Sequence, residues 1–336
     1  MVREWDPRSA SSAEVDSLLD ILNAVLEADQ PGDPPWVDNH LREYLSEVMP
    51  GERRLAWLAE DGSGDAAGML GTISVLLLGD IGVIELFVHP KARGQGVGRR
   101  LLTEATRRAY MEGFSSIGVE VVGGTPSVPF YESFGFRCAY VETRSVLQLA
   151  TVDWLSLGEM ARGIGSGYRI EYYPGGPPDE LIDAYAVAKA EVRDDETGDL
   201  ELRPSSYDPQ RLRESLACLH RRGMKPYIVL AIHEKTDEVA GLTEVVVPAQ
   251  HPTRADQYDT IVVPDHRGYG IDRAIKARML FELRSAEPGL VDVQTWNAPD
   301  NDAMLKVNSE LGFQPDREWL EYEAEVANLV QRLDAP

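Results

Sequence analysis

Apolar and polar positions in the first half of the chain follow two periods, one typical of helices and one typical of strands. Residues 12–28 place Leu18, Leu22 and Val25 on one side at helical spacing, which predicts an amphipathic helix that begins at Ser11 or Ser12. A second helical pattern covers residues 97–110. Short apolar runs, which predict strands, lie at 2–5, 55–59, 69–78, 81–88 and 117–122. Strands and helices therefore alternate, as in an α/β domain.

The same order of elements returns in the second half of the chain. Strand-type runs precede a helical pattern, a further strand and a further helix, at 168–172, 227–232, 239–247, 275–284, 290–295 and 301–311. Pro264 repeats Pro90 at a distance of 174 residues, and Gly312 repeats Gly135 at 177. This self-similarity predicts a duplicated domain. We expect one copy at 1–162 and one at 168–336, joined by a glycine-rich linker at 163–167, with turn-rich loops at 174–178 and 194–198.

Composition narrows the class of protein. The 336 residues carry a net charge of −23, and no apolar run is long enough to span a membrane. The first residues lack the apolar core of a signal peptide, so we expect a cytoplasmic protein. The negative charge argues against a nucleic-acid partner, which needs clustered Lys and Arg, and would attract a cationic small molecule. Cys138 and Cys218 lie far apart and predict neither a disulfide framework nor a metal site.

A glycine-rich loop joins the apolar run 81–88 to the helical pattern 97–110. It consists of Arg93, Gly94, Gln95, Gly96, Val97 and Gly98. A strand that ends in such a loop and then starts a helix directs bare backbone N–H groups and the positive end of a helix dipole at one place. Glycines allow a ligand to approach the backbone closely. The pattern therefore predicts a cradle for a pyrophosphate.

This loop and a second block resemble the GNAT superfamily of acyl-CoA-dependent N-acyltransferases. The acetyl-CoA signature of the family, Q/R-x-x-G-x-G/A, is complete from Arg93 to Gly98, and its Y-x-x-x-G-F block matches Tyr131, Gly135 and Phe136. The resemblance implies two tandem GNAT folds of the α+β type, each a mixed central sheet flanked by helices. It also implies acetyl-CoA as the co-substrate, with no metal.

The resemblance assigns roles to residues of the first copy. The backbone at Phe87 and Val88 would bind the acetyl oxygen and the pantetheine arm, and the loop 93–98 the pyrophosphate. Arg93 and Arg99 are candidates for phosphate contacts. Tyr131 would protonate the departing thiolate.

The general base is left open between two carboxylates and a water chain. Glu85 lies in an apolar strand on the same face as Phe87, where burial would raise its pKa towards that of a useful base. Glu120 lies in the strand 117–122 and is the second candidate.

The second copy departs from the family twice. Asp272 replaces Gly98, which places a carboxylate where the pyrophosphate would lie, and Asn308 replaces Tyr131, although an asparagine cannot release a proton. We therefore expect this copy to be structural or substrate-facing and not a catalyst. The asparagine that binds the pantetheine arm in many members of the family is absent from the first copy, where Gly124 stands at its position. The second copy retains this asparagine as Asn301.

The combined expectation is an N-acetyltransferase that moves an acetyl group from acetyl-CoA to the primary amine of a small, cationic molecule. Two alternatives remain. One is mycothiol synthase-like acetylation of a cysteinyl pseudo-disaccharide, and the other is a non-catalytic acyl-CoA sensor or scaffold. The chain is expected to be a monomer or a homodimer, and the acceptor itself is left open.

Overall fold

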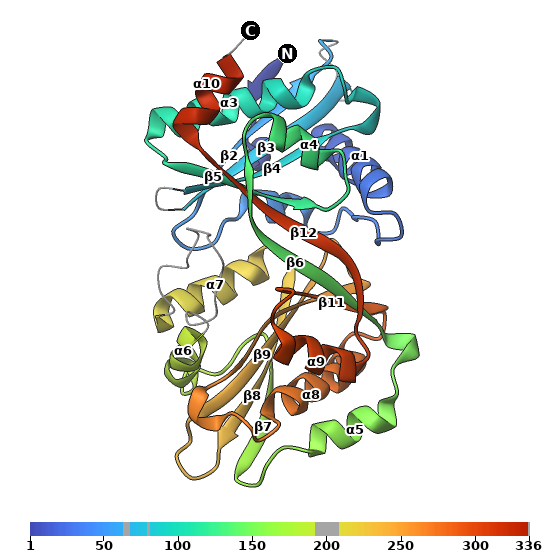
Figure 1. Ribbon diagram of the computed structural model, residues 1–336, viewed down its shortest axis with the longest axis vertical. Coiled ribbons are helices and arrows are strands. Elements are labelled where there is room, and N and C mark those ends of the chain that lie inside the picture. The colour runs from blue at the N-terminus through green and yellow to red at the C-terminus, as the bar shows by residue number, and fades with distance from the viewer. Residues whose placement is uncertain (63–67, 79–80, 192–207, 335–336) are drawn as a thin grey trace. The chain divides into compact units, whose positions relative to one another are not determined.

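The computed structural model describes residues 1–62, 68–78, 81–191 and 208–334 (Figure 1). These residues form two compact units. Unit 1 contains residues 1–141 and 318–334, and unit 2 contains residues 142–191 and 208–317. The predicted loop at 194–198 lies outside the described residues. No helix in the described ranges is long and apolar enough to cross a membrane.

Unit 1 is a mixed sheet with helices on both faces. Its strands lie in the order β1 (Val2–Glu4), β2 (Arg53–Glu60), β3 (Met69–Leu78), β4 (Ile81–Val88), β5 (Ser116–Val122) and β12 (Gln314–Glu325). Only the β4–β5 pair is parallel. Its helices are α1 (Ser12–Asp29), α2 (Leu41–Ser46), α3 (Val97–Glu112), α4 (Ser127–Ser133) and α10 (Val326–Asp334).

Two hydrophobic cores hold the helices of unit 1 to the sheet. On one face α3 and α10 pack through residues such as Leu101 and Leu329 against Ile73 and Ile84. On the other face α1 and α2 pack through Leu18 and Leu41 among others. The α1 prediction is confirmed, because Ser11 and Glu14 form a reciprocal capping box that starts the helix at Ser12.

Unit 2 repeats this architecture. Its strands lie in the order β7 (Tyr168–Pro174), β8 (Met224–His233), β9 (Val239–Pro248), β10 (Arg254–Val262), β11 (Asp292–Asn297) and β6 (Arg137–Gln148), and only the β10–β11 pair is parallel. One face carries α5 (Trp154–Arg162), α8 (Ile271–Ala286) and α9 (Asp302–Leu311), and the other α6 (Ile182–Ala190) and α7 (Pro209–Arg221). The predicted mixed α/β fold is confirmed for each copy.

The two copies exchange their last strands. β6 follows the first copy in sequence, but its residues 143–148 pair with β11 of unit 2. β12 follows the second copy, but its residues 319–325 pair with β5 of unit 1, as Figure 1 shows. The compact units therefore differ from the contiguous segments 1–162 and 168–336. The glycines at 163–167 lie inside unit 2, where the amide of Gly165 donates to the carbonyl of Tyr269.

Candidate active site

Strands β4 and β5 of unit 1 separate halfway along their length. They pair from Ile81 with Ser116 to Ile84 with Val119, and the pairing ends there, although β4 continues to Val88 and β5 to Val122. Glu85 and Glu120 are the first residues after the last pair. The opened edge exposes backbone groups that a continuous sheet would use for its own ladder.

The amides of Leu86 and Val88 face this opening. The amide of His89 donates to the carbonyl of Leu70 on β3, and amides alternate between the two sides of a strand. The amide of Phe87 therefore faces β3, and its side chain lines a pocket on the α1/α2 face of the sheet. The sequence predicted that the backbone of Phe87 and Val88 would contact the cofactor. The amide of Val88 faces the opening, but that of Phe87 faces β3, and the second amide at the opening is that of Leu86.

The glycine loop presents a row of free donors at the start of α3. Within the described ranges, the backbone N–H groups of residues 94–98 make no hydrogen bond, and the amide of Arg100 donates to the carbonyl of Gly96. Gly94 and Gly96 have φ values of 72° and 73°, in the left-handed region that favours glycine. Gln95 and Val97 belong to the same row. The arrangement suits a phosphate-bearing ligand.

Gly98 has a packing role that its place in the motif did not reveal. A Cβ on this residue would lie 3.2 Å from the ring of Phe130 in α4. The glycine thus lets the start of α3 pack against the helix that carries Tyr131.

The two arginines of the motif are engaged by protein groups. Arg93 binds Asp29 at the end of α1 through both terminal nitrogens, at 2.8 and 2.6 Å, and its Nε donates to the carbonyl of Val88 at 3.3 Å. Arg99 donates to the carbonyl of Leu333 in α10. The expectation that these cations bind phosphate is therefore not supported by their positions. Arg93 instead ties the loop to β4 and α1.

Tyr131 lies on α4 in the core of the α3 face, with 3% of its surface exposed. The rings of Phe130 and Phe136 meet it edge to face, each at 5.1 Å between centroids. Burial raises the pKa of the phenol above its usual range, so it keeps its proton. Its hydroxyl makes no hydrogen bond to any residue that the structure describes, which leaves the proton available to a ligand.

Glu85 is the centre of a small polar cluster on the α1/α2 face. Its Oε2 accepts hydrogen bonds from Arg54 Nη1 at 2.8 Å and from Ser74 Oγ at 2.9 Å. The carboxylate side chain is 35% exposed, whereas that of Arg54 is 7% exposed. Glu85 is thus not the isolated buried carboxyl that the sequence suggested.

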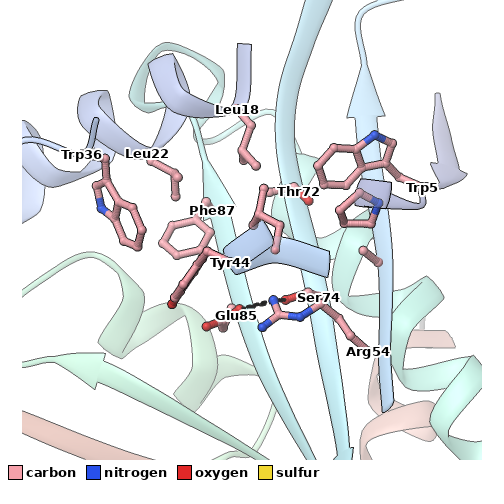
Figure 2. Close-up of a pocket in the computed structure, with 13 residues that line it drawn as sticks. Trp5, Leu18, Leu22, Trp36, Tyr44, Arg54, Thr72, Ser74, Glu85 and Phe87 are labelled. Carbon is pink, nitrogen blue, oxygen red and sulfur yellow. Dashed lines mark hydrogen bonds and ion pairs between the residues drawn. The ribbon is translucent and has the colours of Figure 1, made fainter. Parts of the chain in front are cut away.

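The cluster forms one wall of a cavity of about 60 Å³ (Figure 2). The other walls are apolar side chains from α1, α2 and the segments beside them, which include Leu18, Leu22, Trp36, Tyr44, Leu45 and Trp5. The rings of Trp36 and Tyr44 meet edge to face at 5.5 Å. Because Glu85 and Phe87 line the cavity and Val88 faces the glycine loop, β4 alone separates the pocket from the predicted cofactor side.

Glu120 lies exposed on β5, on the pocket side of the sheet. In the register of β5 and β12 it lies opposite Glu321. Burial raises the pKa of Glu321. No sequence pattern points to Glu321, because it lies about 200 residues from Glu120 along the chain and reaches β5 only through the strand exchange.

Unit 2 keeps the backbone of this loop but differs in the side chains around it. Gly268 and Gly270 keep the left-handed conformation, at φ 85° and 70°, and Arg267 Nε donates to Val262 as Arg93 does to Val88. However, the Asp272 carboxylate accepts from the amide of Arg273 at 2.8 Å and so occupies the start of α8. Asn308, buried at the place of Tyr131, donates to Asn297.

Asn301 has a structural partner as well. Its side chain accepts from the amide of Met304 and thereby caps α9. At the matching place in unit 1, Gly124 has a φ of 75°. The asparagine of the second copy is thus a helix cap in this structure.

Several residues of the pocket carried no recognisable sequence signal. Arg54 reads as an ordinary strand arginine beside Arg53, and Trp36 and Tyr44 lie in a segment without clear periodicity. Only the packing of α1 and α2 on β2 and β4 brings them to Glu85.

Several proteins to which this chain is similar are acetyltransferases. A sequence profile of the acetyltransferase (GNAT) domain family matches residues 52–138. Mycothiol acetyltransferase of Renibacterium salmoninarum is 24% identical over 325 residues, which cover 92% of this chain and 88% of that protein.

Solved structures share the whole architecture. A tandem GNAT protein from the clavulanic acid biosynthesis pathway, solved without AcCoA, superposes with a TM-score of 0.82 at 24% identity, over 97% of this chain and 98% of that one. A GCN5-related N-acetyltransferase from Sphaerobacter thermophilus superposes with a TM-score of 0.65 at 15% identity, over 97% and 95% of the two chains. Residues 52–138 therefore match a GNAT acetyltransferase domain, and the chain as a whole has the fold of a tandem GNAT protein.

Proposed function

We propose that unit 1 transfers the acetyl group of acetyl-CoA to the primary amine of a small molecule bound in the pocket beside Glu85. One observation carries the proposal. The opened edge of β4 has the free amides of the loop 94–98 on one side and a cavity lined by the carboxyl group of Glu85 on the other. This arrangement suits acyl transfer, because an amine in the cavity could reach a thioester whose carbonyl is polarised by the amides of the opened strand.

The donor side would be held by backbone groups. The amides of residues 94–98 would bind the pyrophosphate at the positive end of α3. Those of Leu86 and Val88 would bind the pantetheine arm and the thioester oxygen at the opened edge. This assignment needs no side-chain cation, which agrees with the engagement of Arg93 by Asp29.

Glu85 would act as the general base. The amine nitrogen attacks the thioester carbon, the carbon–sulfur bond breaks, and the proton lost by the amine passes to Glu85 directly or through a water molecule. Glu120 remains the second candidate, since it lies across the opening on the same face of the sheet.

Tyr131 would supply a proton or a hydrogen bond to the leaving thiolate. Its raised pKa keeps the phenol protonated, and its hydroxyl has no competing partner in the described ranges. A phenol of such low acidity is better suited to donating a hydrogen bond to sulfur than to complete proton transfer before the carbon–sulfur bond breaks.

Unit 2 would not catalyse the reaction. Asp272 occupies the helix start that a pyrophosphate would need, and Asn308 is committed to Asn297. We therefore propose one catalytic site per chain.

The acceptor of the related mycothiol acetyltransferase suggests a second candidate. That protein matches 92% of this chain, so a cysteinyl pseudo-disaccharide belongs in any panel of acceptors. A non-catalytic acyl-CoA sensor is the third candidate, and it predicts binding of acetyl-CoA without thiol release.

A thiol-release assay with the full chain separates these candidates. Acetyl-CoA is presented with a panel of primary amines, and products are identified by mass spectrometry. Amine-dependent release that is abolished by Glu85→Gln supports the proposal. If acetyl-CoA binds but no amine promotes release, the sensor is the better explanation.

A further inference from the structure

The cavity beside Glu85 has its charged groups at one end only. At that end the carboxyl group of Glu85 accepts hydrogen bonds from Arg54 and Ser74. Most of the remaining wall is hydrocarbon, contributed among others by Leu18, Leu22, Trp36, Tyr44, Leu45 and Phe87. Figure 2 shows the aromatic rings on one side of the polar group and the two leucines of α1 above it. A ligand in this cavity therefore meets a carboxyl group at one end and non-polar side chains elsewhere.

The other polar groups of the wall are engaged or covered. The hydroxyl of Thr72 donates to the carbonyl of Trp57 at 2.8 Å. The Nε of Arg54 and the indole nitrogen of Trp5 are buried and present no surface to a ligand. The side chain of Arg54 is 7% exposed, whereas that of Glu85 is 35% exposed. Of the two charged residues in the wall, Glu85 is thus the one that a ligand can approach.

Unit 2 shows that a carboxyl group at this place on the sheet can hold a primary amine. Asp259 occupies the position of Glu85, 174 residues later in the chain. Its Oδ2 accepts a hydrogen bond from Nζ of Lys189 at 2.7 Å. This Nζ is a protonated primary amine, as an acceptor is before it loses its proton. By analogy, the amine of the acceptor lies at Glu85 and its carbon skeleton lies in the non-polar part of the cavity.

A second charge on the acceptor would have no partner in that part of the cavity. Moving an ionised group out of water is costly unless an opposite charge and hydrogen bonds receive it. The net charge of −23 attracts cations at long range, but it does not compensate this local loss of hydration. The net charge of the chain therefore does not describe what the cavity can bind.

The cavity has room for a short hydrocarbon group, and one of its walls is held in place. Its volume is about 60 Å³, which is space for about four to six water-sized groups. A branched butyl group or a phenyl ring is of that size. The side chain of Asn23 in α1 accepts from the amide of Trp36 at 2.8 Å and donates to its carbonyl at 3.1 Å. Trp36 is thereby fixed against α1, so this wall is formed before a ligand enters.

We infer that the acceptor is a primary amine with a non-polar carbon skeleton and no second charged group, such as a branched alkylamine or an amine that carries one phenyl ring. Its amine lies at Glu85, and its hydrocarbon packs among the rings and leucines of the cavity. This inference rests on the proposed function, because it names the acceptor class of the same site. It narrows the cationic acceptor that the net charge suggested to one whose only charge is the reacting amine.

Acceptors of equal size test this inference. Pentylamine, 4-aminobutan-1-ol and 1,4-diaminobutane have the same number of non-hydrogen atoms and differ at the end remote from the amine. With acetyl-CoA and the full chain, kcat/KM should fall in that order. From pentylamine to 1,4-diaminobutane, corrected for its two amines, the fall should be at least about tenfold, since a buried methyl group is replaced by a charge without a partner. Equal or better turnover of 1,4-diaminobutane would overturn the inference while leaving acetyl transfer intact.

A charge placed in the non-polar wall should reverse the preference. Leu45 of α2 lines the cavity and is only partly buried, so the fold can accommodate a polar side chain there. Leu45→Glu supplies the missing partner and should shift the ratio of kcat/KM values towards 1,4-diaminobutane by about tenfold or more. Leu45→Gln is the matched control for polarity without charge and should shift the ratio less. Acetyl-CoA affinity, which neither change touches, reports that the variants are folded. A parental ratio in folded Leu45→Glu would contradict the inference.

Binding without chemistry separates this inference from the proposed function. Trp5 and Trp36 line the cavity, so pentylamine should change the tryptophan fluorescence of the parent protein in the absence of acetyl-CoA, and 1,4-diaminobutane at the same concentration should not. If pentylamine binds in this way but is not acetylated, the ligand class stands and the proposed function fails. If neither fluorescence nor turnover distinguishes the two amines, the inference is wrong.

Discussion

Units 1 and 2 share a fold and differ where ligands would bind. Both have the same strand order, the same two left-handed glycines before the helix, and an arginine whose Nε binds the last carbonyl of the preceding strand. These shared features hold the strand–loop–helix connection. The glycine motif alone therefore indicates a strand–loop–helix connection and is not sufficient evidence for an active site.

The donor side shows the difference most directly. In unit 1 Gly98 packs on Phe130, whereas in unit 2 the carboxylate of Asp272 accepts the amide of Arg273 in the first turn of α8. Val307 of unit 2 occupies the position of Phe130 in unit 1. The small Gly98 is thus combined with the large Phe130 in unit 1, and the larger Asp272 with the smaller Val307 in unit 2.

The acceptor side differs as well. The positions of Ser74 and Glu85 are held in unit 2 by Glu244 and Asp259, and Lys189 of α6 binds both carboxylates. Tyr185 of the same helix donates to Glu244. Burial and the neighbouring Asp259 raise the pKa of Glu244. Where unit 1 has a largely non-polar cavity beside Glu85, unit 2 has a cluster of mutually paired charges.

The largest expected effect comes from removing the hydroxyl group of Tyr131. Tyr131→Phe should lower kcat by about 10²–10⁴-fold with little change in acetyl-CoA affinity, because the hydroxyl acts mainly in the transition state. Asn308→Ala, the matching change in unit 2, should leave kcat unchanged. Steady-state kinetics and calorimetry measure both quantities. Parental turnover in Tyr131→Phe would remove this residue from the mechanism.

Substitutions at corresponding positions of the exchanged strands β6 and β12 should have opposite effects on stability. Arg144 of β6 is 2% exposed and binds Asp316 and Gln294. Arg144→Ala should therefore lower the free energy of unfolding by about 1.5–3 kcal/mol, since it removes a buried side chain with charged hydrogen bonds to Asp316. The residue of β12 that corresponds to Arg144 is Glu321. Burial raises the pKa of its carboxyl group.

Glu321→Gln serves as the matched variant and should leave the free energy of unfolding unchanged or raise it. Urea unfolding followed by circular dichroism gives both values. The interpretation fails if Glu321→Gln is the more destabilising of the two.

Converting the loop of unit 1 to that of unit 2 tests the donor site. Gly98→Asp combined with Phe130→Val should weaken acetyl-CoA binding by about tenfold or more, because the carboxylate opposes the pyrophosphate at the helix start. Phe130→Val alone separates the packing effect from the charge. Calorimetry on the parent should give one site per chain, and two equivalent sites would show that Asp272 is no barrier.

The smallest effect concerns a buried lysine of unit 2. Lys276 of α8 stands where unit 1 has the apolar Leu102, and burial lowers its pKa from 10.5 to about 7. Above pH 7 the unfolded chain binds more protons at this residue than the folded protein does, so stability rises with pH up to about 10.5.

Lys276→Met should abolish that rise, which amounts to about 1 kcal/mol between pH 7 and pH 8. Its stabilising effect should be greatest below pH 7, where the parent buries the charged form. Urea unfolding of parent and variant at several pH values measures the difference. An unchanged pH dependence in the variant would assign the slope to another group.

Local patterns predicted most of the helices and strands. The α1 helix, β3 and β4 appear at the predicted residues, because their apolar periods and the Ser11 cap act within a few neighbours. The free amides at 94–98 followed from glycines next to a helix start. The details that failed depend on distant partners, such as the pairing of Arg93 with Asp29 and of Glu85 with Arg54.

The sequence by itself determined that the chain is a duplicated GNAT fold with one complete and one altered loop, since these features depend on spacing and residue type. Only the tertiary structure decided which strand completes each sheet. β5 and β11 offer equivalent edges to β6 and β12, and strand pairing is a long-range choice that apolar patterns do not encode. The pocket was decided in the same way, because Arg54, Glu85 and the rings of α1 and α2 meet only when the sheet and its helices pack.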